Sequence, residues 1–122
     1  MLQSKHPLYK SFVYAVEGLL TAITKGRNFR IQLFAGLLAA TLGLILGLSS
    51  LEWLALIIIV SFVLILELIN TSLEAIVDMV SPEIAGKAKI AKDVAAAAVL
   101  ISSLASILAG FILFLPKILQ GI

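Results

Sequence analysis

The sequence predicts an all-α membrane protein in which three membrane-spanning helices follow an amphipathic helix that lies in the membrane interface. Hydrophobic residues make up 61% of the 122 residues and charged residues only 13%, whereas a soluble domain has about 45–50% and about 25%. A soluble chain with this composition would expose large apolar patches. The apolar residues also fall into three long stretches, which is the pattern expected when the bilayer is the solvent.

The first predicted element is a helix over residues 7–28. Apolar residues recur there at helical spacing, with polar residues such as Lys10, Glu17 and Thr24 among them. A helix with one apolar and one polar face is suited to lie in the plane of the membrane interface. The alternative is a helix that packs on the other helices in the manner of a soluble protein, and the pattern is compatible with both.

Three spans are predicted, over residues 31–49, over 52–80 and, after a polar connection, within 82–116. The first and third have about the 20 apolar residues that cross a bilayer. The second continues helically to Val80, so its roughly 42 Å exceed the roughly 30 Å of the hydrocarbon core. One of its ends should therefore reach the headgroups or line a cavity within the protein. Nothing within 1–122 indicates a second domain, so a single membrane domain is predicted.

Charge placement predicts the orientation. Basic residues cluster before the first span and between the second and third, whereas only Lys117 lies beyond the third. Because basic loops stay in the cytoplasm, we expect a cytoplasmic N-terminus and an external C-terminus in the cell (inner or plasma) membrane. This clustering argues against nucleic acid as a partner. The chain has no cysteine and a single histidine, His6, which excludes cysteine-based and multi-histidine metal sites.

The most informative segment is ELINTSLEAIVD, which begins at Glu67. At 100° per residue, Glu67, Asn70, Glu74 and Asp78 lie within about 80° of one another on one helix face. Ionisable residues at membrane depth are costly and usually mark a functional site. The alternative is that the stripe is simply the hydrated end of a long helix, among the lipid headgroups.

Carboxylates in this arrangement suit two tasks. They can bind a hard cation such as Mg²⁺ through oxygen, and one of them can accept a proton from a hydroxyl group. Antiparallel packing would bring them near Lys92 and Asp93 at the start of the third span, where a lysine could balance the charge of a nucleotide polyphosphate. Taken alone, the basic loop can also be explained as a topology signal, and the sequence has no glycine-rich phosphate loop.

The segments ELINTSLEAIVD, AKDVAAAAV, SFVYAVEGL and NFRIQ resemble those of the prokaryotic diacylglycerol kinase and undecaprenol kinase family. The resemblance covers nearly the whole chain. It implies a lipid kinase that uses ATP and Mg²⁺ and forms a homotrimer with sites shared between protomers. The form KIAKDVAAAAV and the compact N-terminus look more like the undecaprenol kinase branch, which favours undecaprenol over diacylglycerol as the acceptor.

Position by position, the resemblance implies residue roles. Glu67 would be the general base and would contact the lipid hydroxyl, and Glu74 would bind the metal. The residues implied to bind ATP are Tyr14, Glu74, Glu83, Lys92 and Asp93. The residues implied to lie along the lipid substrate, besides Glu67, are Asn28, Phe29, Arg30 and Gln32. Asn70 and Asp78 would be supporting polar residues of the same site.

The sequence departs from the family at Gly26, where the resemblance implies a second metal-binding glutamate. Metal binding would then rest on Glu74, the phosphates and water, which Mg²⁺ tolerates because it keeps several waters. Two other classes stay open. A non-catalytic membrane paralogue is favoured only by Gly26. A small transporter or channel subunit would use intramembrane Glu and Asn for an ion path, but here the strong polar groups gather at one end of the second span.

Overall fold

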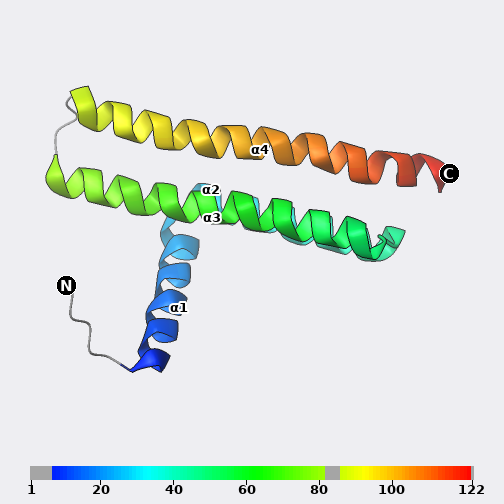
Figure 1. Ribbon diagram of the computed structural model, residues 1–122, viewed down its shortest axis with the longest axis horizontal. Coiled ribbons are helices and arrows are strands. Elements are labelled where there is room, and N and C mark those ends of the chain that lie inside the picture. The colour runs from blue at the N-terminus through cyan, green and yellow to red at the C-terminus, as the bar shows by residue number, and fades with distance from the viewer. Residues whose placement is uncertain (1–6, 82–85, 122) are drawn as a thin grey trace.

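The computed structural model describes residues 7–81 and 86–121, and the described residues form four α-helices (Figure 1). These are α1 (Leu8–Lys25), α2 (Arg27–Leu46), α3 (Ser50–Val80) and α4 (Gly86–Gln120). The three long helices run alongside one another, and α1 turns away from their common direction (Figure 1). Because α2, α3 and α4 are each long and apolar enough to cross a membrane, the predicted all-α fold with three spans is confirmed.

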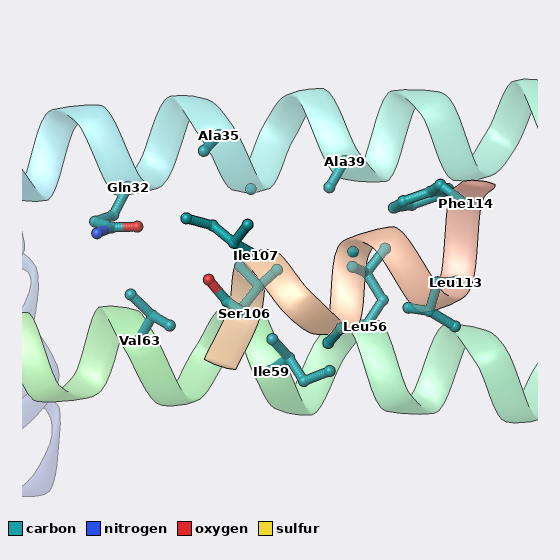
Figure 2. Close-up of a pocket in the computed structure, with 14 residues that line it drawn as sticks. Gln32, Ala35, Ala39, Leu56, Ile59, Val63, Ser106, Ile107, Leu113 and Phe114 are labelled. Atoms are coloured by element: carbon teal, nitrogen blue, oxygen red, sulfur yellow. The ribbon is translucent and has the colours of Figure 1, made fainter. Parts of the chain in front are cut away.

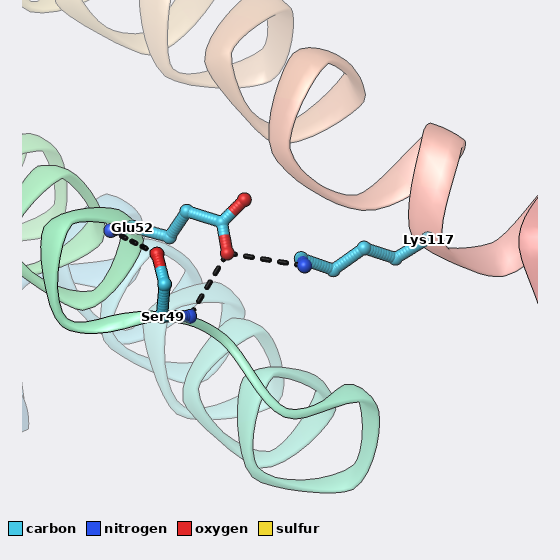
Figure 3. A network of polar contacts seen from close by, with 3 residues as sticks. All are labelled: Ser49, Glu52 and Lys117. Atoms are coloured by element: carbon cyan, nitrogen blue, oxygen red, sulfur yellow. Dashed lines mark hydrogen bonds and ion pairs between the residues drawn. The ribbon is translucent and has the colours of Figure 1, made fainter.

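The turn between α2 and α3 is fixed by its local sequence (Figure 3). Gly47 ends α2 with a φ of 74°, a left-handed conformation that glycine adopts without a Cβ clash. Ser49 then caps α3: its hydroxyl accepts from the Glu52 backbone N–H at 3.2 Å, and the Glu52 carboxylate accepts from the Ser49 N–H at 2.9 Å. Lys117 of α4 reaches the same carboxylate at 3.1 Å, so this network joins the start of α3 to the end of α4.

The three long helices share a small apolar core built on Leu48, Leu56 and Phe114. Most large apolar side chains lie outside it, and Phe62 and Leu108, for example, are 54% and 64% exposed. In water this surface would favour aggregation. Acyl chains are as apolar as these side chains, so the same exposure is expected for helices surrounded by lipid.

The junction between α1 and α2 is held by Arg30. Its guanidinium donates to the carbonyl oxygens of Ile23 at 2.8 Å and Thr24 at 3.1 Å, which belong to the last turn of α1 and have no partner within that helix. Gly26 lies between the two helices, and a Cβ added there would be 2.6 Å from the Ala22 carbonyl oxygen. The junction in this form therefore leaves no room for a side chain at position 26.

Helix α1 exposes much of its apolar surface. Leu8, Phe12 and Val16 are between 54% and 75% exposed, and only Ala22 is buried in the helix. An interfacial position in the membrane stays a prediction for this helix. In the interfacial position, lipid would cover these side chains. If α1 lay in water and packed on the other helices only as it does here, the same side chains would contact water.

Helix α3 has 31 residues and is therefore about 46 Å long, which exceeds the thickness of the hydrocarbon core. It ends at Val80, the last residue of the predicted second span. Helix α4 begins at Gly86 and continues without interruption to Gln120. The predicted nucleotide-binding residue Glu83 lies outside the described residues.

Candidate active site

Glu67 is the most buried acidic residue among the described residues. Its relative exposure is 3%, and it shares one face of α3 with Leu56 and Val63, the other buried residues of that helix. An ionisable group in the interior of an apolar bundle is expensive and usually serves a function. Glu67 therefore faces the other helices of the chain rather than the surrounding acyl chains.

Asn70 and Thr71 continue the polar stripe by one turn. The Thr71 hydroxyl donates to the backbone carbonyl of Glu67 at 2.9 Å, so it satisfies itself within the helix. The Asn70 side-chain oxygen is buried and has no hydrogen-bond partner among the described residues. A buried acceptor without a donor costs about 1–3 kcal/mol, so Asn70 offers an acceptor to a bound molecule.

Lys92 of α4 is held against the end of this stripe. Its ammonium group lies 2.7 Å from the Asp78 carboxylate, and the Lys92 side chain is 27% exposed while that of Asp78 is 61% exposed. Glu74 lies within electrostatic range of both Glu67 and Lys92. The structure thus brings Glu67, Glu74, Asp78 and Lys92 to one region at the end of the α3–α4 hairpin.

The other residues assigned to the nucleotide are placed differently. Asp93 pairs with Lys89 on α4 at 2.7 Å, and both side chains are more than 60% exposed. Tyr14 lies on α1 and is 52% exposed. Two lysines of the segment KAKIAKD therefore have different partners: Lys89 pairs within its own helix, whereas Lys92 pairs across to α3.

The predicted lipid-contacting segment begins α2. Asn28 is exposed, Phe29 is 4% exposed, and Arg30 bonds to α1 as described above. The Gln32 amide donates to the Ser103 hydroxyl of α4 at 2.8 Å, so it links two helices. Ser103 was not among the predicted site residues, because a serine in an apolar helix gives little indication of its partner. Lipid contact by this segment stays a prediction.

The residues near Lys92, at the end of the α3–α4 hairpin, offer the kinds of ligand that suit a magnesium ion, but few of them. Carboxylate and amide oxygens are the ligands Mg²⁺ prefers, and Glu74 and Asn70 supply them one turn apart. Within 7–81 and 86–121, however, no three Asp, Glu or His side chains converge on one point. Gly26 adds no carboxylate to the site. Protein ligation of a metal would therefore centre on Glu74.

Three apolar helices and an acidic stripe, which runs from the buried Glu67 to the Asp78 that pairs with Lys92, define the class. The protein is a membrane protein with a charged site at one end of its bundle. Comparison with known proteins identifies the group to which it belongs. Residues 13–114 match the family described as prokaryotic diacylglycerol kinase. The chain belongs to this family.

Individual relatives agree with that assignment but differ in their acceptor. A diacylglycerol kinase of Synechocystis is 42% identical over 114 residues, which cover 93% of this chain and 65% of the relative. An undecaprenol kinase of Bacillus subtilis is 34% identical over 110 residues, which cover 90% of this chain and 89% of the relative. A diacylglycerol kinase of Helicobacter pylori is 37% identical over 94 residues, which cover 77% of this chain and 73% of the relative. The chain thus spans just under two thirds of the Synechocystis relative.

Proposed function

We propose that this protein is a lipid kinase that transfers the γ-phosphoryl group of Mg·ATP to the hydroxyl group of a membrane lipid. Undecaprenol is the favoured acceptor and diacylglycerol the alternative. Membership of the family supports the class of reaction. The observation that carries the proposal is the buried Glu67 on the same helix face as Glu74, with Lys92 held against that face.

Glu67 acts as the general base. As the lipid oxygen attacks the γ-phosphorus, the bond from that phosphorus to the bridging oxygen of ADP breaks, and the hydroxyl proton moves to the Glu67 carboxylate. The burial of Glu67 keeps water from competing with the lipid hydroxyl as a nucleophile. The products are a lipid monophosphate and ADP, with the proton released from Glu67 afterwards.

Glu74 and Lys92 act on the nucleotide. Glu74 would hold Mg²⁺, which when bound neutralises charge on the phosphates. An ammonium group has three donors, so Lys92 can keep its contact with Asp78 and still donate to a phosphate oxygen. Phosphoryl transfer depends mainly on positioning and electrostatic stabilisation, so these few groups are sufficient for a chain of this size.

The membrane arrangement follows from the same assignment. ATP reaches the site from the cytosol, so the end of the bundle that holds Lys92 faces the cytoplasm, with the N-terminus on that side and the C-terminus outside. The lipid hydroxyl lies at the interface on the same side. A homotrimer is the proposed assembly, because the resemblance to the family implies one. Small residues along the helices permit close helix contacts, which is consistent with oligomerisation.

The proposal is tested by an acceptor screen. Purified protein in mixed micelles with radiolabelled Mg·ATP should phosphorylate undecaprenol, and diacylglycerol should be the poorer acceptor. The measurement is lipid-dependent transfer of label. An absence of labelled lipid with every alcohol, or ATP-independent ion flux through protein-containing liposomes, would instead favour the non-catalytic or the channel interpretation.

Lys92 and Lys89 form a matched pair for testing the nucleotide site. Both make an ion pair of 2.7 Å, but only Lys92 pairs with α3. A hydrogen bond to a charged group contributes about 1.5–3 kcal/mol. Lys92→Gln should therefore raise the KM for Mg·ATP by about 10- to 150-fold, whereas Lys89→Gln should change it by less than about threefold. Equal effects of the two substitutions in steady-state assays would contradict the assignment.

A further inference from the structure

A cavity of about 170 Å³ lies between α2, α3 and α4 (Figure 2). Small residues of α2 and α4, among them Ala39 and Gly110, leave the space, and Phe114 and Leu113 close one end of it. Gln32 lies at the opposite end. The lining is apolar apart from Gln32 and Ser106, so the cavity suits a hydrocarbon group.

The cavity lies directly below Glu67 along α3. Leu56 and Val63 line it, and together with Glu67 they are the buried residues of α3. At 100° per residue these three positions fall within about 40° of one another. Glu67 follows Val63 by four residues, which is about 6 Å along the helix axis. A group bound in the cavity would therefore point its near end at the Glu67 carboxylate.

We propose that this cavity binds the first isoprene unit of a prenyl alcohol, the unit joined to the carbon that carries the hydroxyl group. The inference rests on the proposed function and deepens it, because it assigns the choice of acceptor to particular residues. An apolar cavity of about 150 Å³ stays dry and binds benzene, a six-carbon molecule. The present cavity is slightly larger, and an isoprene unit has five carbons.

The chemistry next to the hydroxyl group separates this acceptor from diacylglycerol. In diacylglycerol, ester groups lie within a few atoms of the hydroxyl, and a buried ester carbonyl without a donor is unfavourable. The polar side chains of the cavity already donate hydrogen bonds to Ser103: Gln32 donates to its hydroxyl at 2.8 Å, and the Ser106 hydroxyl donates to its carbonyl at 2.7 Å. A second N–H of the Gln32 amide remains, at one end of the cavity. The cavity therefore favours an alcohol whose first carbons are hydrocarbon.

Filling the cavity tests the inference. A Cβ added at Gly110 would meet no atom within 4 Å, so Gly110→Leu can place its side chain in the space. Displacing a methylene group from a hydrophobic pocket costs about tenfold or more. Gly110→Leu should raise the KM for a short prenyl alcohol by at least about tenfold and leave the KM for Mg·ATP unchanged. Ala97→Leu adds the same side chain at an exposed position of α4 and should change neither value.

A second measurement uses the unaltered protein and does not need turnover. A short prenyl alcohol with a diazirine on its first isoprene unit is bound and photolysed, and the labelled residues are found by mass spectrometry. Label is expected on the residues that line the cavity, which lie within 32–39, 56–63 and 106–114. Label confined to other residues, or an acceptor KM unaffected by Gly110→Leu, would overturn the cavity assignment. Cavity labelling without phosphoryl transfer would overturn the proposed kinase activity and leave the binding site standing.

Discussion

Glu67→Gln is expected to abolish phosphoryl transfer while the protein still folds. Glutamine keeps the shape of the side chain but cannot take up the hydroxyl proton, and general base catalysis contributes about 10²- to 10⁴-fold to the rate. Because Glu67 is 3% exposed, solvent has little access to replace it as the proton acceptor. The substitution also removes an ionisable group from the bundle interior, so no loss of stability is expected from it.

The measurement is kcat in mixed micelles, with the KM for Mg·ATP determined in parallel. The nucleotide KM should stay within about threefold of the wild type, because Lys92 and Glu74 are unchanged. Glu52→Gln is the control, since Glu52 lies in the first turn of the same helix, at its other end. Its ion pair is partly exposed and contributes about 0.2–1 kcal/mol, so activity should be kept. A wild-type kcat in Glu67→Gln would exclude Glu67 as the base.

Glu74→Gln should make the enzyme depend on much higher Mg²⁺ concentrations. Among the described residues no trio of acidic or histidine side chains gathers around a point, so loss of the Glu74 carboxylate leaves few protein ligands for the metal. Loss of residues that merely support metal ligands costs about 10- to 100-fold in metal affinity or activity. Loss of the ligand itself should therefore raise the Mg²⁺ concentration for half-maximal activity by at least about 100-fold.

A magnesium titration at constant ATP measures this effect. Glu17→Gln, which neutralises an acidic residue of α1 outside the proposed site, should give the wild-type titration. An unchanged magnesium requirement in Glu74→Gln would show that the metal is held elsewhere. Such a result would leave the role of Glu67 untouched, because the two substitutions act on different parts of the reaction.

The spans were predictable because hydrophobicity and helical continuity are local properties. Val80 ends α3 as the periodicity indicated, and Gly47 and Ser49 mark the turn before it by their residue types. The first residue of α2 was harder to predict from the sequence. The helix begins at Arg27, before the apolar stretch, because polar residues such as Arg30 can continue a helix while their side chains bond to a neighbouring helix.

The site was predictable in part for the same reason. The spacing of Glu67, Asn70 and Glu74 places them on one face of α3 whatever surrounds that helix. The partners of Lys89 and Lys92 could not be told apart, because both follow the same helical pattern and only packing against α3 distinguishes them. The cavity could not be predicted from the sequence either, since it depends on which small residues of α2 and α4 meet around Val63.

Each end of the α3–α4 hairpin carries one ion pair between the helices, Lys92 with Asp78 and Lys117 with Glu52. If α4 slid along α3 by a single turn, about 5.4 Å, both ammonium groups would leave their carboxylates together. Both ion pairs can therefore form together in only one axial register of the hairpin. That register also fixes the height of Glu67 against α4, about 16 Å and 22 Å along the helix from Asp78 and Glu52.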